Sequence, residues 1–498
     1  MNWLLCVSLA LVGPAPTTVA MPGGELLWPQ FRGPGGEGHV AQTGLPLEWS
    51  DTEGKTKNVV WKTPILGLGW SSAVINGNQV WITTSIEIPP PAGAPPVAGP
   101  SSSPFRLVAD AKDAAPSTAP SPAATPPAAP PLNLDKLLDG KPAADKKNDT
   151  DKKPADDKVK KPAEVAEPPD PKQPPIQLRA ICLDRETGKV LHDVLLFNIA
   201  DPGRIHKKNS HASPTPLLDG DMLYLHFGRH GTACITTAGE IVWKTQELVY
   251  KHQHGPGGSP VVFGDLLLLS CDGTDVQYVV GLDKATGKIK WKMPRQGRMA
   301  YTTPLLVDVD GQTQLLSSGG DAVIAYDPTT GKELWQCKYD GYSLVPRPVV
   351  GHGLAFICTG YNTPSVIAVR LGGTGDVTES HLVWTLKKGA PHNPSPLLVG
   401  DELYLIADRG IATCVDAKTG TEIWQDRVGG NFSASPLLAD GRIYLLDENG
   451  KCTVIAVGKE FKVLAENTVD GRTLASLSVA GKSIFLRTDT HLYRIEQR

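Results

Sequence analysis

Residues 282–291 read LDKATGKIKW, and the phrase returns as YDPTTGKELW at 326–335 and as VDAKTGTEIW at 415–424. In each copy an Asp stands four residues before a Gly, which in turn stands four residues before a Trp. Asp and Thr side chains bond the backbone of tight turns, and Gly adopts the left-handed conformation that other residues resist. The phrase therefore predicts a fixed turn followed by an outer β-strand, whose Trp fills the gap between two neighbouring repeats.

A second phrase, in which Pro follows a small residue or Ser/Thr and precedes two apolar residues, marks the start of each repeat. Six clear copies begin at Ser213, Gly258, Thr302, Pro346, Pro394 and Ala434, and weaker ones begin at Trp70 and Leu474. Each copy resolves into four short β runs, and Trp243, Trp291, Trp335, Trp384 and Trp424 lie 48, 44, 49 and 40 residues apart. Four antiparallel strands at this period are typical of a propeller blade. The sequence therefore predicts an all-β fold, an eight-bladed β-propeller of four-stranded antiparallel blades.

The structural positions of this repeat are the Asp and Gly of the turn and the Trp of the outer strand. They are Trp61, Asp184, Gly188, Trp243, Asp283, Gly287, Trp291, Asp327, Gly331, Trp335, Trp384, Asp416, Gly420 and Trp424.

The two ends of the chain complement each other. The eighth copy stops at Arg498 after a third strand, whereas NVVWKTP at 58–64 has the pattern of a fourth strand and precedes the first copy. We expect this N-terminal strand to close the last blade, so that no sheet edge stays open. The propeller is then 58–85 and 177–498, preceded by an N-terminal extension, 21–57, and interrupted in blade one by 86–176, which holds 22 of the 44 prolines. We expect this Pro/Ala/Lys/Asp-rich insertion to be disordered.

The first twenty residues combine an apolar run, a Gly-Pro breaker and small residues, which predicts a signal peptide over 1–20 and a periplasmic or secreted protein. A start at Met21 is the alternative. The formal charge of −3 argues against nucleic-acid binding, and no further stretch is long and apolar enough to span a membrane. Cys6 lies in the predicted signal peptide. The other seven cysteines lie in strand-like runs without a CxxC pair, which predicts that they are buried hydrophobic residues. We expect a monomer.

The phrases DRETGKV, DKATGKIKW, DPTTGKELW and DAKTGTEIW resemble the pyrroloquinoline-quinone-type repeat of quinoprotein dehydrogenases and BamB-like outer-membrane assembly scaffolds. LLWPQFRGPGGEG, with Trp28, Phe31, Arg32 and Gly33, resembles the opening of a planctomycete-type group of secreted bacterial propellers. The resemblance implies either a non-catalytic binding or scaffolding protein, or a dehydrogenase of alcohols or sugars that uses the quinone (PQQ) with calcium.

The enzymes of this family hold their cofactor with an adjacent-cysteine disulfide, a Glu and Asn on the metal, and a catalytic Asp. The chain has no Cys-Cys pair, and the other residues have no identifiable counterparts. We therefore assign no catalytic residue and no metal ligand, and favour the binding or scaffolding function, with a small molecule or a protein as partner.

The central funnel is where a propeller gathers its inner strands, so residues just before those strands are the first candidates for a ligand site. They are Trp70, His211, His254, Tyr301, Arg347, Asn393, Phe432 and Arg472. One interpretation is an anionic or carbonyl-rich ligand held by Arg347, Arg472 and Lys207 between flat rings. The other is ordinary loop polarity. His252 and His254 could share a strand face and bind a metal, although no third ligand has a clear spacing to them.

Overall fold

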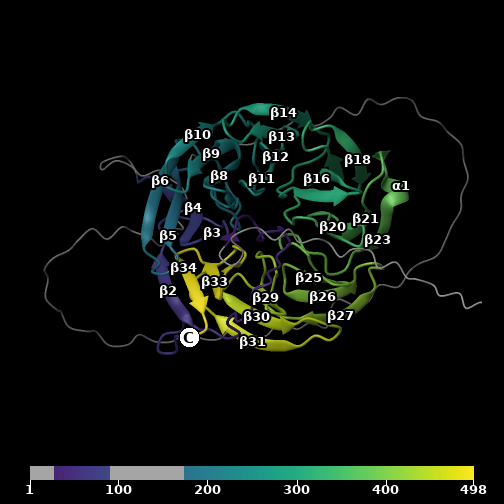
Figure 1. Ribbon diagram of the computed structural model, residues 1–498. Helices are drawn as coiled ribbons and strands as arrows, with labels where there is room; N and C mark the ends of the chain where they lie inside the picture. Colours follow the sequence, from purple (N-terminus) through teal and green to yellow (C-terminus); the bar gives the residue numbers. More distant parts are fainter. Residues whose placement is uncertain (1–26, 90–172) are drawn as a thin grey trace, which may run out of the picture. The chain divides into compact units, whose positions relative to one another are not determined.

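A computed structural model describes residues 27–89 and 173–498. The described residues belong to one compact unit. The predicted signal peptide and nearly all of the predicted insertion lie outside the described residues. Within the compact unit, eight antiparallel sheets follow one another around a ring (Figure 1), which confirms the predicted eight-bladed propeller.

Each of the first four blades runs from its inner strand outward in sequence order. Blade 1 contains β3 (Val74–Asn76), β4 (Gln79–Glu87), β5 (Ile176–Asp184) and β6 (Val190–Ile199), with β1 (Leu27–Trp28) beside β3. Blade 2 contains β7 (Leu217–Asp219), β8 (Met222–His226), β9 (Thr232–Thr236) and β10 (Ile241–Thr245), with a 3-10 helix, η2 (Gly228–His230). Blade 3 contains β11 (Val261–Phe263), β12 (Leu266–Asp272), β13 (Gln277–Asp283) and β14 (Ile289–Pro294). Blade 4 contains β15 (Leu305–Val309), β16 (Gln312–Ser318), β17 (Ala322–Tyr326) and β18 (Glu333–Lys338).

The remaining blades repeat this order, except that the last one borrows a strand. Blade 5 contains β19 (Val349–Gly351), β20 (Leu354–Cys358), β21 (Val366–Arg370) and β23 (Leu382–Leu386); before β23 come β22 (Gly375–Asp376), which pairs in parallel with β18, and α1 (Thr378–His381). Blade 6 contains β24 (Leu397–Val399), β25 (Glu402–Ile406), β26 (Ile411–Asp416) and β27 (Glu422–Arg427). Blade 7 contains β28 (Leu437–Ala439), β29 (Arg442–Leu446), β30 (Lys451–Ala456) and β31 (Val463–Thr468). Blade 8 contains β32 (Ser478–Ala480), β33 (Ser483–Arg487), β34 (His491–Glu496) and β2 (Val59–Pro64).

The ring closes where β2 pairs with β34, opposing Trp61 to Arg494 and Pro64 to His491. The purple and yellow ends of the chain meet here in Figure 1. This confirms that an N-terminal strand completes the last blade. Strands β4 and β5 extend slightly past the predicted limits of the propeller, because Glu87 pairs with Ile176. No helix among the described residues is long and apolar enough to cross a membrane.

The repeated turn is held as its residue types require. Asp283 Oδ1 accepts hydrogen bonds from Thr286 N and Oγ1, both at 2.9 Å, and Gly287 has a φ of +74°. Asp416 and Thr419 repeat both bonds at the same distance. Such bonds fix the turn that leads into the outer strand.

The Trp of one blade lies on the turn Gly of the next. Trp384 Nε1 donates to Ala417 O at 3.0 Å, and a Cβ at Gly420 would lie 2.7 Å from the indole. Trp61 likewise donates to Arg185 O at 2.9 Å, across the joint where the ring closes. Trp335 differs, because it is fully buried in the core shared by blades 4 and 5 and donates to Gln314 Oε1 of its own blade. The Trp-Gly contact therefore joins successive blades and explains why the two residues recur together.

The N-terminal extension is part of the ring. Residues 27–28 add a strand to blade 1, Pro29 O accepts from Leu218 N of blade 2, and Gly38 O accepts from Leu438 N of blade 7. The segment then follows blade 7 outward, where Trp49 stacks on Tyr444 with ring centroids 6.1 Å apart. It thus crosses the inner side of the ring before it becomes β2.

Candidate functional site

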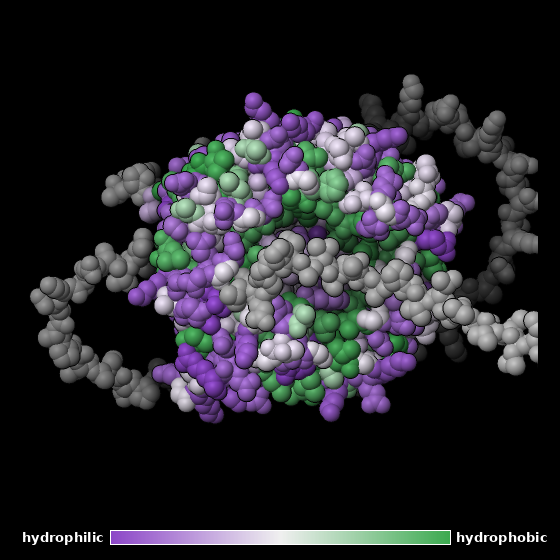
Figure 2. All heavy atoms as spheres, viewed as in Figure 1, coloured by the Kyte–Doolittle hydropathy of each residue, from purple (hydrophilic) through white to green (hydrophobic). Residues whose placement is uncertain are grey.

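A cavity of about 1230 Å³ occupies the centre of the ring, at the end where the inner strands begin. Figure 2 shows the ring hollowed toward its centre, with hydrophobic residues along much of the visible hollow and hydrophilic residues over much of the periphery. Its lining comes from loops between blades and from turns between second and third strands, such as Tyr361 and Asp408. Phe31 of the N-terminal segment is also part of the lining.

The inner strands are joined by a belt of hydroxyl groups. The backbone N–H of Thr215 donates to Ser259 Oγ at 2.9 Å, and that of Ser259 donates to Thr303 Oγ1 at 2.9 Å. The belt has one residue from each blade and consists of two runs of such bonds, one through Ser72, Thr215, Ser259 and Thr303 and one through Arg347, Ser395, Ser435 and Ser476. This belt explains why Ser or Thr recurs before the inner strands, and only Arg347 lacks a hydroxyl.

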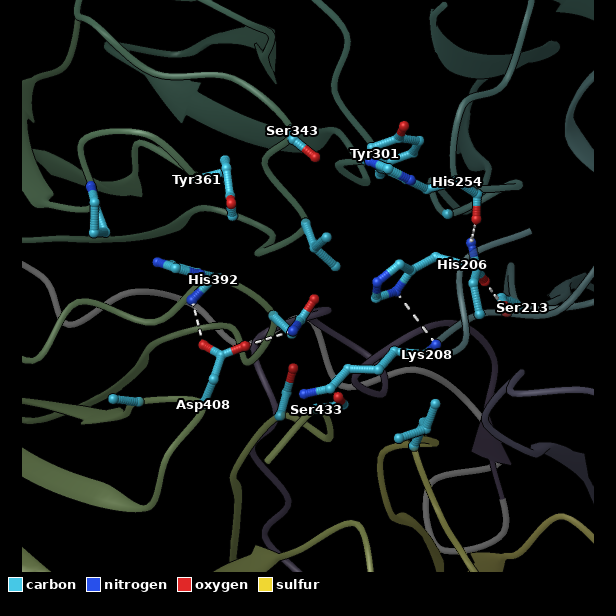
Figure 3. A pocket seen from close by; sticks show the side chains of 18 of the residues that line it. His206, Lys208, Ser213, His254, Tyr301, Ser343, Tyr361, His392, Asp408 and Ser433 are labelled. Carbon is cyan, nitrogen blue, oxygen red and sulfur yellow. Dashed lines mark hydrogen bonds between the residues drawn. The ribbon is translucent and has the colours of Figure 1, made fainter. Parts of the chain in front are cut away.

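Aromatic and imidazole rings form much of the cavity wall (Figure 3). His254 lies between His206 and Tyr301, with ring centroids 5.4 and 5.9 Å away, and Tyr361 lies 6.2 Å from Tyr342. Tyr361 is 64% exposed, so a large flat surface is available to a ligand. Burial and the neighbouring Lys207, Lys208 and Arg472 lower the pKa of His206, which favours its neutral form.

Two charged residues of the wall are held by neighbours. Asp408 accepts hydrogen bonds from the His392 backbone N–H and the Asn393 amide (Figure 3). Lys208 forms an ion pair with Glu448 at 2.7 Å. Asp408 is the only carboxylate among the described lining residues.

Three further cations of the lining, Lys387, Lys388 and Arg409, are exposed and have no hydrogen-bond or ion-pair partner within the described part of the chain. The cavity therefore carries a surplus of positive charge on the side of blades 5 and 6.

The structure brings only part of the predicted ring to the cavity. Trp70, His254, Tyr301 and Asn393 line it. His211 is buried against His230, with Nδ1 and Nε2 3.2 Å apart, and Phe432 is buried in the core between blades 6 and 7.

The two predicted arginines lie outside the lining. Arg472 stacks over Trp70, 5.8 Å from the ring centroid, and donates to Lys207 O, while Arg347 is buried against the N-terminal segment. The predicted residues stand two to seven positions before their inner strands, whereas the residue four positions before each inner strand lines the cavity in every blade; Trp70, Tyr301 and Asn393 occupy that position.

The cations of blades 5 and 6 and Tyr361 were not among the predicted site residues. They follow outer or second strands, and comparing the turn ADRG at 407–410 with DENG at 447–450 would have pointed to Arg409.

His252 and His254, which could have shared a strand face, pack against different neighbours. The His252 ring lies 4.7 Å from that of Tyr250, whereas His254 packs on His206. No group of three or more His, Cys, Asp or Glu residues among those described could hold a metal ion.

The family described as "Outer membrane protein assembly factor BamB" matches residues 177–294, 376–460 and 414–498. BamB from Moraxella catarrhalis is 14% identical, with a TM-score of 0.46, over 64% of this chain and 94% of that one. A europium-containing methanol dehydrogenase is 11% identical, with a TM-score of 0.44, over 64% of this chain and 81% of its own. The quinohemoprotein alcohol dehydrogenase from Comamonas testosteroni is 11% identical, with a TM-score of 0.46, over 66% and 72%. No curated protein matches the sequence.

Proposed function

Because the chain is a β-propeller of pyrroloquinoline-quinone-like repeats, we propose that it is a non-catalytic binding or scaffolding protein of the periplasm or cell exterior. Its axial cavity binds an anionic ligand with a flat or ring-shaped face, either free or carried by a protein partner. The observation that carries this proposal is the excess of unpaired cations beside an exposed aromatic wall.

Electrostatics favour an anion. The Lys208 charge is balanced by Glu448, and Asp408 is the single lining carboxylate, so Lys387, Lys388 and Arg409 leave the described cavity wall positive. Carboxylate, sulfate and phosphate groups are the usual partners of exposed Lys and Arg in such a cavity.

Ring surfaces favour a ligand that also offers a face. Tyr361 lies between Tyr342 and His392, with ring centroids 6.2 and 6.1 Å away, and these neighbours hold it in place. Aromatic residues bind large flat groups with little loss of conformational entropy. Acidic sugars combine such a face with a negative charge.

The quinone-dependent alternative requires a calcium site. Ca²⁺ takes six to eight oxygen ligands, several of them carboxylates. The described cavity wall offers Asp408 alone, and that carboxylate already accepts two hydrogen bonds. The seven described cysteines are free and buried, and no two are adjacent. The residues present do not fit the quinone and its metal, and we derive no reaction from them.

Calorimetric titration with trigalacturonate, with neutral galactotriose and with an oligoglutamate peptide tests the proposal. We expect trigalacturonate to bind and galactotriose not to, with affinity falling at high salt because the contacts are ionic. Binding of the peptide alone would indicate a protein partner.

The triple substitution Lys387→Gln, Lys388→Gln and Arg409→Gln should abolish binding. The matched control replaces the exposed Lys189, Lys288 and Lys332, which follow turns of other blades, and should bind normally. Equal binding by both variants would refute the cavity as the site. Reduction of a dye with alcohols or sugars after addition of quinone and calcium would instead establish a dehydrogenase.

A further inference from the structure

Two buried arginines meet on the inner side of the ring, and neither is part of the cavity lining. Arg32 of the N-terminal segment and Arg347 of blade 5 are each 2% exposed. Arg32 Nη2 donates to Glu37 O and Pro396 O, both at 2.7 Å, and Arg347 Nη1 donates to Gly36 O and Phe31 O, both at 3.2 Å. Since the accepting carbonyls of Gly36 and Glu37 are adjacent in the chain, both guanidinium groups lie against the same short stretch.

Several N–H groups of this pair are unsatisfied. Arg32 Nε and Nη1 and Arg347 Nε are buried and have no acceptor among the described residues. Neither arginine forms an ion pair within that part of the chain: Glu37 accepts a hydrogen bond from Arg32 through its backbone oxygen, and its carboxyl acts on both arginines only through its charge. A buried charge without a counter-charge strongly destabilises a fold, and a buried donor without an acceptor adds to that cost.

The two guanidinium groups also act on each other. Burial, and next the charge of Arg347, lower the pKa of Arg32 to about 9, and burial lowers the pKa of Arg347 to about 10. Both groups therefore stay charged at neutral pH. Burial raises the pKa of Glu37, whereas the charges of Arg32 and Arg347 act in the opposite direction.

The chain is built around this pair. Arg347 occupies the belt position that is Ser or Thr in the other seven blades, so the blade gives up a belt hydroxyl to place a guanidinium here. A Cβ at Gly36 would overlap Arg347 Nη1, and one at Gly38 would lie 2.8 Å from Arg32 Nη2. The backbone thus wraps closely around both groups.

We propose that Arg32 and Arg347 bind a monoatomic anion of the halide class, which accepts hydrogen bonds from their free N–H groups. The anion neutralises the buried charge and fastens the N-terminal segment to the inner side of the ring. This site is separate from the ligand cavity and does not depend on its function.

Crystals grown without chloride and soaked in sodium bromide test the site directly. We expect an anomalous peak within hydrogen-bonding distance of both Arg32 Nε and Arg347 Nε. Density that refines as water alone, with no anomalous signal, would overturn the proposal.

Halide-dependent stability tests it in solution. Chloride replaces gluconate at constant ionic strength while thermal unfolding is followed by circular dichroism. Above its dissociation constant, chloride should lower the unfolding equilibrium constant by about tenfold for each tenfold rise in concentration, as linkage requires for one site in the folded state. If thermal unfolding is the same in chloride as in gluconate, the protein has no specific halide site.

Arg347→Met keeps the bulk of the side chain without its charge and should abolish the chloride response. If this variant does not fold, the bromide crystals of the unaltered protein still decide. The cavity variant Lys387→Gln, Lys388→Gln and Arg409→Gln is the control and should keep the full response. The loss of sugar binding in the cavity variant and the loss of halide binding in Arg347→Met can therefore be distinguished.

Discussion

The contact between Trp384 and Gly420 predicts a measurable cost for one added methyl group. Gly420 has a φ of +71°, and its added Cβ would lie 2.7 Å from the indole. The ring cannot withdraw freely, because its Nε1 donates to Ala417 O and its face packs on Phe356. Gly420→Ala should therefore be strained in two ways, by its backbone conformation and by the overlap.

Gly441→Ala separates these two contributions. Gly441 has a φ of +68°, and no atom lies within 4 Å of an added Cβ. The left-handed conformation costs an L-residue about 1–2 kcal/mol, partly offset by the loss of entropy in the unfolded chain. Overpacking adds about 1–3 kcal/mol. We expect Gly441→Ala to lower the free energy of unfolding by about 1 kcal/mol, and Gly420→Ala by about 2–4 kcal/mol.

Urea unfolding followed by circular dichroism measures both variants. In a Trp384→Ala background the indole is gone, so the extra cost of Gly420→Ala should disappear and leave a coupling energy of about 1–3 kcal/mol. The reasoning is refuted if Gly420→Ala costs no more than Gly441→Ala, or if the extra cost persists without the indole.

Three further predictions concern the ring, its pH dependence and its core. Deleting residues 58–64 removes β2 and should abolish cooperative thermal unfolding, because β34 loses its partner; an unchanged melting curve would show that closure is dispensable. Burial lowers the pKa of His226 from 6.5 in the unfolded chain to about 4. The stability that the neutral, buried ring contributes to the fold is therefore complete above pH 6.5. The free energy of unfolding should fall by roughly 3 kcal/mol as the pH falls toward 4. His226→Gln should flatten this part of the curve of stability against pH. Asp272 and Arg295 form a fully buried ion pair, so Asp272→Asn should cost about 3–5 kcal/mol in urea unfolding, and an effect under 1 kcal/mol would argue that the pair is hydrated.

The sequence by itself determined the number of blades, the turn between their outer strands and the closing strand. These features are local and periodic. Asp283 and Gly287 act within one turn, and each blade meets its neighbour in the same way, since Trp243 lies on Gly287 and Trp291 on Gly331. An unfinished eighth repeat and an extra strand at the N-terminus were therefore enough to predict closure.

Only the tertiary structure decided the composition of the cavity and the path of residues 27–57. Tyr301 stands four residues before its inner strand and reaches the cavity, whereas Phe432 stands five residues before its own and is buried between blades. Arg32 and Arg347 lie far apart in sequence and meet only because the N-terminal segment crosses the inner side of the ring. Contacts of this kind depend on where the closed ring brings distant segments together, which no local pattern records.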